Sequence, residues 1–337
     1  MSKTHSFGIV GATGAVGRKI LQVLSEQRIT PSKIRLFASE KSKGIKLPFN
    51  DASLEVEDLD GADFSGLDVV FFSAGTDVSK LHCPRAVKAG AVVIDNTNAF
   101  RMDPDVPLVV PEVNPHAIKR HKGLIANPNC STIQMVVAID PIHRVNPIKR
   151  IVVTTYQSVS GTGLDAIGIL KAQTRAQLDE KPIPGGVYPH PIGFNLFPHI
   201  DIFLENGLCR EEEKMIRETQ KIMEAPIPVC PTTVRVPIFY CHSEAVNLDL
   251  TNPFDLLTIK NVLANSQGIT ICDDPEHNLY PTPLNCQDKD DVFVGRIRRD
   301  ESLLNGLNLW VVSDNLRRGA ASNAVFIYKR MVADGLL

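Results

Sequence analysis

The chain has 337 residues, more than one hydrophobic core usually supports, so we expect two domains. Apolar residues make up 43% of the sequence and the formal net charge is −2, so no basic excess favours nucleic acid or an anionic membrane as a partner. The apolar runs are shorter than the roughly 20 residues that cross a bilayer, and the first residues lack a signal-peptide layout, so we expect a cytoplasmic protein.

The first part of the chain alternates strand-like and helix-like patterns. The apolar run Ser6–Val10 ends in a glycine loop, and apolar residues then recur at helical spacing over Ala15–Glu26. This alternation predicts an α/β fold with a Rossmann-type, doubly wound parallel sheet. Further strands are expected at Ile34–Ala38, Leu67–Ser73, Ala91–Asp95 and Leu108–Val110, with a helix at Val78–Ala89.

After Ile125 the pattern changes to a mixed order, which predicts an α+β domain with a largely antiparallel sheet. A Pro-, Gly- and His-rich loop, Lys181–Asp201, is expected to be a surface excursion or an interface arm. The helical pattern of Asn315–Ala333 could return to the first domain. We therefore predict a dinucleotide-binding domain of residues 1–129 and 315–337 and a second domain of residues 130–314. Within the latter we expect strands at Lys149–Val159, Thr233–Phe239, Glu244–Leu250 and Asp291–Arg298, and helices at Asp165–Asp179 and Glu211–Met223.

The loop between the first strand and the first helix reads Gly-Ala-Thr-Gly-Ala-Val-Gly from Gly11 to Gly17. A glycine fingerprint in this context allows a tight turn and brings backbone N–H groups and a helix N-terminus close to a pyrophosphate. An ordinary βα turn is the alternative interpretation. The context favours a dinucleotide site.

The residues after the second strand should determine whether the protein prefers NAD or NADP. It contains the hydroxyls of Ser39 and Ser42, the cations Lys41 and Lys43, and the acid Glu40. Hydroxyls and cations suit a 2′-phosphate, whereas an acidic side chain suits a free ribose hydroxyl unless it points away. On balance the segment favours NADP.

Cys130 is the candidate nucleophile. It follows Asn127-Pro128-Asn129 and precedes a nine-residue helical pattern that ends at Ile139, so it should lie at a helix N-terminus. That position lowers a thiol pKa and supplies N–H groups for an oxyanion. A buried structural cysteine is the alternative. The seven cysteines include no Cys-x-x-Cys pair, so we predict no metal site.

Two further residues could serve a thiolate nucleophile. His242, between two strand-like runs, is a candidate proton donor and acceptor, and Arg235, seven residues earlier, presents a planar fork that fits a carboxylate. Taken alone, the histidine could be a hydrogen-bonded structural residue and the arginine a solvated charge. Their conjunction with Cys130 favours the catalytic interpretation.

Eight segments, in order across nearly the whole chain, resemble bacterial aspartate-β-semialdehyde dehydrogenase. They are GATGAVG, NAFRM, PNCSTIQM, TYQSVSG, FNLFPHID, EEEKMIRET, VRVPIFYCHSEAV and WVVSDNLRRGAASNAV. The resemblance implies NADP-dependent reductive dephosphorylation of aspartyl phosphate, a small-molecule substrate, through a thioester on the cysteine. It also implies that the second domain is both catalytic and dimerising, which gives a homodimer or a homotetramer.

The resemblance assigns roles by position. It implies catalytic roles for Cys130, His242 and Gln157. Substrate contacts are implied for Arg235 with the α-carboxylate, Glu211 with the amino end, Arg101 and Lys214 with phosphate, and Asn129. Cofactor contacts are implied for Gly11, Thr13, Gly14, Ala15, Val16, Gly17, Ser39, Lys41, Ser42, Ser160, Gly161 and Asn315.

The sequence departs from the family pattern at two places. Lys41 stands where the family commonly has arginine, with Glu40 and Lys43 instead of small neighbours, and Tyr240 and Cys241 replace a basic residue and a glycine before the histidine. Two other functions remain open at this stage. One is a reductase for a different acyl phosphate or a CoA thioester, and the other is a non-catalytic relative that acts as a binding module.

Overall fold

The computed structural model describes residues 4–337, which form two compact units. The first unit contains the chain up to Asn129 together with Ala320–Leu337, and the second contains Cys130–Gly319. The chain therefore leaves the first unit once and returns to it for its last helix. Each unit is built on its own sheet.

The first unit has a seven-stranded sheet in the order β3-β4-β2-β1-β5-β6-β7, parallel except where β3 pairs with β4. Because β2 and β5 flank β1 on opposite sides, the carboxyl end of β1 is a switch point, where such sheets bind ligands. The strands are β1 (Ser6–Val10), β2 (Lys33–Ala38), β3 (Lys46–Phe49), β4 (Ala52–Asp58), β5 (Val69–Phe72), β6 (Val92–Asp95) and β7 (Leu124–Ala126); the helices are α1 (Ala15–Glu26), α2 (Thr76–Lys88) and α8 (Ser322–Ala333), with the shorter η1 (Glu40–Ser42) and η2 (Pro115–Arg120).

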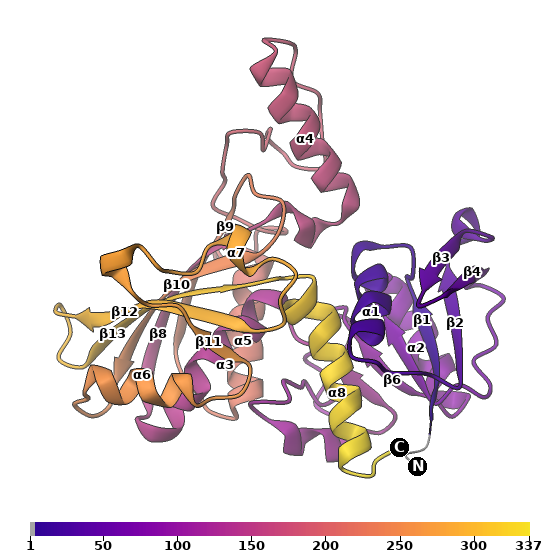
Figure 1. The fold of residues 1–337 in the computed structure, drawn as a ribbon, viewed down its shortest axis with the longest axis horizontal. Coiled ribbons are helices and arrows are strands. Elements are labelled where there is room, and N and C mark those ends of the chain that lie inside the picture. The colour runs from indigo at the N-terminus through magenta and orange to yellow at the C-terminus, as the bar shows by residue number, and fades with distance from the viewer. Residues whose placement is uncertain (1–3) are drawn as a thin grey trace. The chain divides into compact units, whose positions relative to one another are not determined.

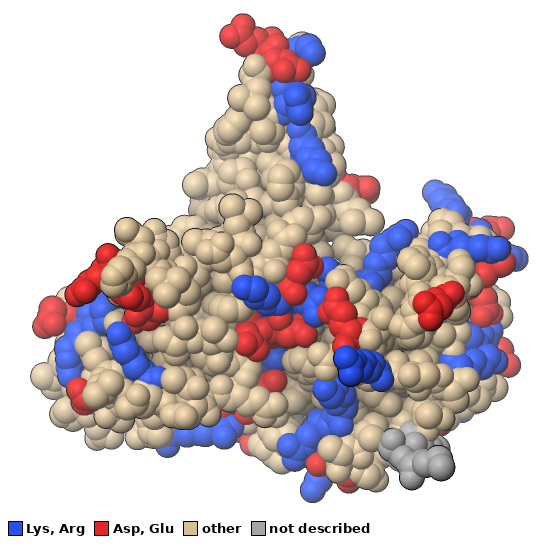
Figure 2. Space-filling view, in the orientation of Figure 1, with Lys and Arg blue, Asp and Glu red and all other residues tan. Residues whose placement is uncertain are grey.

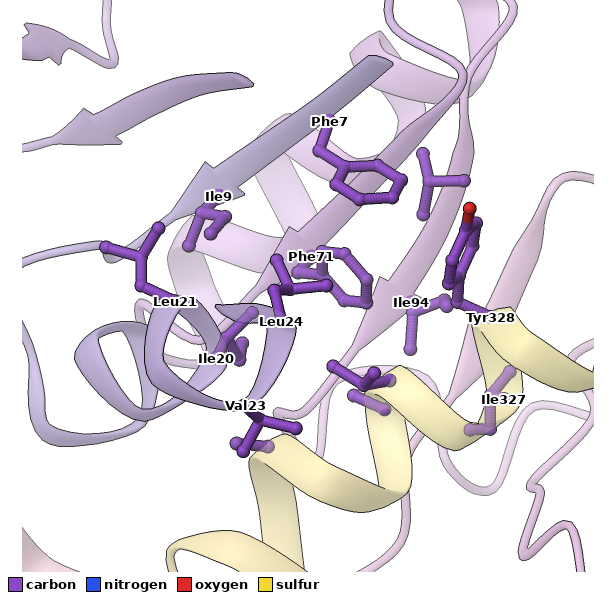
Figure 3. Packing of buried hydrophobic residues seen from close by; sticks show 14 of the residues in the cluster. Phe7, Ile9, Ile20, Leu21, Val23, Leu24, Phe71, Ile94, Ile327 and Tyr328 are labelled. Carbon is purple, nitrogen blue, oxygen red and sulfur yellow. The ribbon is translucent and has the colours of Figure 1, made fainter. Parts of the chain in front are cut away.

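Apolar strands hold this sheet inside the first unit. Every residue of β1 and β5 is buried, as expected for parallel strands covered on both faces. The ring of Phe7 lies 4.9 Å from that of Tyr328 and 5.8 Å from that of Phe71, so α8 closes the core over β1 and β5. Figure 3 shows this packing and labels Phe7, Ile9, Ile20, Leu21, Val23, Leu24, Phe71, Ile94, Ile327 and Tyr328.

The second unit has a six-stranded sheet in the order β11-β12-β13-β10-β8-β9. The three central pairings are antiparallel and the two outer ones parallel, so the sheet is mixed. Its strands are β8 (Ile148–Gln157), β9 (Val229–Arg235), β10 (His242–Leu250), β11 (Ile269–Ile271), β12 (Val292–Asp300) and β13 (Gly306–Ser313); its helices are α3 (Cys130–Val145), α4 (Leu164–Leu178), α5 (Arg210–Met223), α6 (Leu256–Ala264) and α7 (Pro283–Cys286), with the shorter η3 (Val159–Thr162) and η4 (Pro275–His277).

One face of this sheet is covered by α3, which contacts β8, β10, β12 and β13. Even-numbered residues of β10, from His242 to Leu250, are buried, whereas Ala245 on the other face is exposed. This alternation is the period of a strand with one packed face. Figure 1 shows α4 standing out from the sheet of this unit. The predicted loop Lys181–Asp201, which follows α4, contains no helix or strand.

Two predicted strands are wrong in extent, and prolines explain both. Leu108–Val110 forms only an isolated bridge, Leu108 with Ala126, because Pro107 and Pro111 on either side have no N–H for a ladder. The strand predicted at Thr233–Phe239 ends at Arg235, shortly before Pro237.

Two helices also differ from prediction. The helix at Cys130 does not end at Ile139 but continues through Pro141 to Val145. The helix predicted over Asn315–Ala333 begins at Ser322, after a π-helical turn, η5, at Arg317–Ala321. Sequence patterns missed β3, β4, β7, β11, β13, α6 and α7, whereas the remaining predicted helices and strands are confirmed within a few residues.

Within residues 4–337, no helix is long and apolar enough to span a bilayer. Figure 2 shows Lys and Arg side chains interspersed with Asp and Glu on the visible face. This face therefore carries no broad field of one sign, which is what attracts a nucleic-acid backbone.

Candidate active site

The glycine loop is tightly packed at two of its glycines. Gly11 has φ +83°, and a Cβ there would lie 2.9 Å from backbone atoms of Ser73. A Cβ on Gly17 would lie 2.3 Å from the carbonyl oxygen of Gly11, so α1 approaches the loop too closely for a side chain. Gly14 is the N-cap of α1 and provides no side-chain cap for the first N–H groups. A tight turn that leaves helix N–H groups at its mouth fits a dinucleotide pyrophosphate.

The segment after β2 meets this loop. The hydroxyls of Thr13 and Ser42 are 3.4 Å apart, and Lys41 is exposed beside them in η1. Ser39 and Glu40 are also exposed. Arg18, which sequence reasoning missed, donates from Nε to the carbonyl of Thr13 at 2.9 Å and adds a cation at this loop. The first unit thus brings together hydroxyls and cations of the kind that bind phosphate.

Cys130 is the first residue of α3 and is half-buried. The other cysteines have different surroundings. Burial raises the pKa of the Cys83 and Cys241 thiols, and raises that of Cys286 to about 12. Because a thiolate is the nucleophilic form, these buried cysteines are poor nucleophiles, and the helix start at Cys130 is the better place for one.

Gly319 packs directly against Cys130. A Cβ on Gly319 would lie 2.5 Å from Cβ of Cys130 and 3.0 Å from its Cα, closer than such atoms approach in proteins. The glycine in the predicted helical segment Asn315–Ala333 was the only sequence signal of this contact, because an isolated glycine in a helical pattern often marks a close approach.

We expect Gly319→Ala to push Cys130 out of place and to lower kcat/KM by about 10- to 100-fold, because displacement of a reacting group by about 1 Å can cost this much. The measurement is steady-state kinetics together with the rate of Cys130 alkylation by iodoacetamide. Gly168→Ala is the matched control, because a Cβ there, in α4, meets no atom within 4 Å. Equal kinetics for the two variants would show that the contact does not position the thiol.

Strand register brings three predicted site residues into one row. Gln157 of β8 pairs with Arg235 of β9 on one side and with His242 of β10 on the other. His242 in turn pairs with Ser313 of β13. Paired residues of neighbouring strands share a face, so these four side chains, here called the polar row, cross the sheet together. All four are at least 95% buried.

The tautomer of His242 follows from its hydrogen bonds. The backbone N–H of Ser158 donates to Nδ1 at 3.1 Å, so Nδ1 is an acceptor and the neutral ring carries its proton on Nε2. Within the described part of the chain Nε2 has no hydrogen-bond partner. It faces exposed Gly161, where an added Cβ would lie 3.4 Å away. Burial, with the charge of Arg235, lowers the pKa of His242 to about 3, so the ring is a neutral N–H donor.

Arg235 is buried beside this histidine. Its NH1 donates to the carbonyl of Ser158 at 2.5 Å, and its guanidinium lies 5.7 Å from the ring centre of Tyr188. Ser158 therefore binds His242 through its N–H and Arg235 through its carbonyl. Gly161 also lies over this pair, since a Cβ there would be 3.5 Å from NH1 of Arg235. Gly161, which has no side chain, thus leaves space beside His242 and Arg235 of the polar row.

A chain of polar contacts extends from Gln157 to the surface. Its Oε1 accepts from Thr155 at 3.0 Å, and its Nε2 donates to Glu211 at 3.1 Å. The other oxygen of Glu211 binds Nζ of Lys214 at 3.1 Å, and this ammonium also binds Asp201 at 3.2 Å. These contacts fix the orientation of the Gln157 amide and place a carboxylate and an ammonium beside the row.

Two predicted cofactor residues lie in a buried cluster next to His242. Oδ1 of Asn315 accepts from the hydroxyls of Ser158 and Ser160 at 3.2 and 3.1 Å and from the N–H of Cys241 at 3.0 Å. Cys241 has φ +68°, which is rare for a residue with a Cβ. Asn315 therefore holds the turn that precedes His242. Sequence reasoning identified Ser160 and Asn315 but missed Ser158, which is the hub of both clusters.

Two predicted substrate residues belong to the first unit. Arg101 is 7% exposed and donates to the carbonyls of Asn127 and Asn96 at 3.0 and 2.8 Å. Asn129, the last residue of that unit before α3, is also buried. The chain thus runs from the first unit, through buried Asn129, directly into the helix that begins with Cys130.

Comparison with known proteins also divides the chain into two parts. Residues 6–121 match the family model described as semialdehyde dehydrogenase, NAD binding domain, and residues 139–318 match the one described as semialdehyde dehydrogenase, dimerisation domain. The chain is 49% identical over 338 residues to aspartate-semialdehyde dehydrogenase of Aquifex aeolicus, covering 99% of each protein. It is 50% identical to the Legionella pneumophila enzyme of the same name, over 100% of this chain and 98% of that protein.

Solved structures of aspartate-semialdehyde dehydrogenases are also similar to this chain. Aspartate semialdehyde dehydrogenase II of Vibrio cholerae, solved in complex with ASA, is 46% identical and superimposes with a TM-score of 0.97 over 99% of both chains. The Candida albicans enzyme, solved with NADP, is 26% identical with a TM-score of 0.77, over 99% of this chain and 100% of that one. With full-length relatives at this identity, the chain belongs to the aspartate-semialdehyde dehydrogenase family.

Proposed function

We propose that this protein catalyses the NADP-dependent reductive dephosphorylation of L-aspartyl 4-phosphate to L-aspartate 4-semialdehyde, a step toward lysine, threonine, methionine, isoleucine and diaminopimelate. The observation that carries the proposal is the polar row. It places Arg235, Gln157 and neutral His242 side by side on three neighbouring strands, with Glu211 attached to Gln157. These groups suit a small substrate with a carboxylate, an ammonium and a reacting carbonyl.

Cys130 begins the reaction in this proposal. Its thiolate attacks the acyl carbon of aspartyl phosphate, and the C–O bond to phosphate breaks, so that phosphate leaves with the bonding electron pair. A thioester remains on the sulfur. Because α3 starts at Cys130 itself, the first N–H groups of this helix can stabilise the oxyanion that forms at the carbonyl.

Arg235 and Glu211 would hold the two ends of the amino-acid group. The guanidinium of Arg235 presents a fork to the α-carboxylate, and one carboxylate oxygen of Glu211 faces the ammonium. Arg101 and Lys214 would bind the departing phosphate by charge. Lys214 already bridges Glu211 and Asp201, so it can exchange one of these contacts for the phosphate without leaving its position.

His242 would stabilise the oxyanion that forms during the reduction. The bound nicotinamide supplies the hydride that reduces the thioester. The N–H at Nε2 of His242 would donate a hydrogen bond to the oxyanion of the resulting thiohemiacetal on Cys130, and the oxyanion would then expel the sulfur as the C–S bond breaks, which releases the aldehyde and restores the thiolate. A lowered pKa suits this role, because the neutral ring keeps its single proton on Nε2 as a hydrogen-bond donor.

The cofactor would bind at the glycine loop and the segment after β2. The N–H groups at Thr13–Val16 would hold the pyrophosphate, and Lys41 with Ser42 would hold the 2′-phosphate. Ser160, Gly161 and Asn315 would contact the nicotinamide end. The exposure of Glu40 supports NADP, because its carboxylate is free to turn into solvent.

We further propose that the protein is a homodimer through the second unit, with a homotetramer as the alternative. The uncovered face of the second sheet presents half-buried Tyr156 and Trp310, whose ring centres are 5.6 Å apart. Beside them lies a hollow of about 480 Å³ lined in part by Ala245, Pro281 and Leu309. Light scattering of the purified protein distinguishes the two assemblies, and a monomer would contradict both.

The test is the reverse reaction with the full chain. We expect NADPH to form from NADP only when aspartate semialdehyde and phosphate are both present. Replacing phosphate by coenzyme A, the semialdehyde by an aldehyde without the amino and carboxylate groups, or NADP by NAD should each lower the rate. A rate that survives without phosphate, or is highest with coenzyme A, would favour the acyl-CoA reductase alternative. No rate with any combination would favour a non-catalytic relative.

A further inference from the structure

Asp314 is a buried carboxylate that has no role in the proposed mechanism. It follows the last residue of β13, is 1% exposed, and begins the stretch Asp314–Gly319, here called the 314–319 segment. Burying a carboxylate is costly unless its oxygens accept hydrogen bonds. Asp314 accepts three of them, all from backbone N–H groups, so its side chain fixes the path of the chain around it.

The two oxygens of this carboxylate bind different parts of the chain. Oδ1 accepts from the N–H groups of Leu316 and Arg317 at 2.9 and 3.0 Å, which shapes the turn that follows. Oδ2 accepts from the N–H of Asp288 at 2.9 Å, which ties the turn to the loop after α7. Nε of Arg317 donates to Asp290 of the same loop at 2.8 Å. The turn is therefore both shaped and anchored.

The far end of the 314–319 segment lies against the nucleophile. The N–H of Gly319 donates to the backbone carbonyl of Asp314 at 3.2 Å, which is the i→i+5 spacing of a π-helical turn. Gly319 in turn lies so close to Cys130 that a Cβ on the glycine would be 2.5 Å from Cβ of the cysteine. A change in the shape of this turn therefore moves the surface on which Cys130 rests.

The near end of the segment lies beside the imidazole. Asn315, the residue next to Asp314, accepts from the N–H of Cys241 at 3.0 Å and so holds the turn before His242. One short segment thus contacts the neighbour of His242 at one end and Cys130 at the other. Its shape contributes to the distance between the sulfur and the imidazole.

We propose that Asp314 is a positioning residue, whose carboxylate fixes the shape of the 314–319 segment and thereby holds Cys130 in place relative to His242. The inference rests on the proposed function in taking these two residues as the reacting groups. A carboxylate that only stabilised the fold would, when removed, lower the stability without a specific loss of reactivity at Cys130. Kinetics and alkylation separate the two roles.

The kinetic experiment compares Asp314→Ala with Asp314→Asn in the full-length protein. We expect Asp314→Ala to lower kcat about tenfold with little change in KM, because it removes all three hydrogen bonds and lets the sulfur shift by a fraction of an ångström. Asp314→Asn keeps one side-chain oxygen for the two bonds inside the turn. It should therefore recover most of the lost kcat.

Alkylation by iodoacetamide, followed for each cysteine by peptide mass spectrometry, tests the position of the sulfur without substrate. Alkylation of Cys130 should slow by about threefold or more in Asp314→Ala, because a sulfur displaced from the start of α3 loses the N–H groups that favour its thiolate. Exposed Cys230, on β9, should react at the wild-type rate and serves as the internal reference. Since no substrate is needed, the result stands even if the proposed function is wrong.

A double variant tests whether Asp314 acts through Gly319. If it does, Asp314→Ala should add little to the loss of kcat in Gly319→Ala, because the contact with Cys130 is already disturbed there. Independent sites would instead multiply their effects on kcat. Multiplied effects would overturn the inference.

Asp300→Ala is the matched control. Asp300 also shapes a turn, through the N–H of Ser302 at 3.0 Å, but it pairs with the first residue of β13 and so lies at the other end of that strand from Asp314. We expect a lower Tm with unchanged kcat and unchanged alkylation of Cys130. If Asp314→Ala behaves in the same way, the inference is wrong. If Asp314→Ala does not fold, Asp314→Glu tests the same contacts, because its carboxylate is one methylene further from the backbone, and wild-type values in that variant overturn the inference equally.

Discussion

Replacing Cys130 by serine should lower phosphate-dependent NADP reduction by about 10⁴-fold or more, because loss of a covalent nucleophile removes the whole reaction path. The serine hydroxyl is nearly isosteric with the thiol but does not ionise near neutral pH. Dinucleotide binding should be unchanged, since the glycine loop belongs to the other unit. Steady-state rates and NADP titration by fluorescence measure the two effects.

Mass spectrometry of protein quenched with aspartyl phosphate or with semialdehyde plus NADP should show one acyl adduct on the peptide that contains Cys130. Cys230→Ser is the matched control, because Cys230 is the exposed cysteine and lies on an edge strand of the same unit. It should retain full activity and the adduct. An adduct on a different residue, or activity that survives Cys130→Ser, would remove the thioester mechanism.

Local patterns in the sequence predicted the centre of the first sheet, because strands such as β1 and β5 are continuous apolar runs between helices. They missed the outer strands β3, β4 and β7 of this sheet, and in the second sheet they missed β11 and the central strand β13. The strand β13 reads Gly-Leu-Asn-Leu-Trp-Val-Val-Ser and follows the turn of residues 301–305, yet only its pairing with β10 and β12 shows that it is central. Short edge elements such as β11 and β3 depend on their neighbours, so no local signal identifies them.

The candidate site shows the same division between local and long-range information. Cys130 at a helix start is a local feature, and the sequence predicted it. The polar row is not local, because the alignment of Gln157 with both Arg235 and His242 depends on the register of β8 with two strands that are far from it in sequence. Ser158 and Gly319 were missed for the same reason. Each acts by where its backbone lies and not by a reactive side chain.

The turn before His242 explains one departure from the family pattern. Cys241 adopts a left-handed backbone conformation in which the glycine of that pattern would carry no strain. Here the Cys241 thiol is packed with Cys286, Phe293 and Val312, and its N–H binds Asn315. Packing and this hydrogen bond thus offset the strain, and the conformation that directs His242 into the row is kept.

His242→Asn should lower kcat by about 10²- to 10³-fold, the usual cost of removing one donor to an oxyanion. Asparagine is the informative replacement, because its Oδ1 can accept the N–H of Ser158 in place of Nδ1 while the Nε2 proton is lost. The binding of substrate should therefore change little. With NADPH present, the acyl adduct on Cys130 should persist in this variant, since the oxyanion formed by the reduction loses the donor at Nε2.

The same variant tests the protonation state of the imidazole. Because its pKa is lowered to about 3, the ring stays neutral in the folded protein but takes up a proton on unfolding below its ordinary value of 6.5. Its contribution to stability is thus present above pH 6.5 and is lost as the pH falls toward 3. The Tm of His242→Asn should consequently fall less than that of the wild type between pH 7 and pH 5. Parallel curves would mean that folding does not lower the pKa of this histidine, in which case the ring is not held neutral and the assigned role would be wrong.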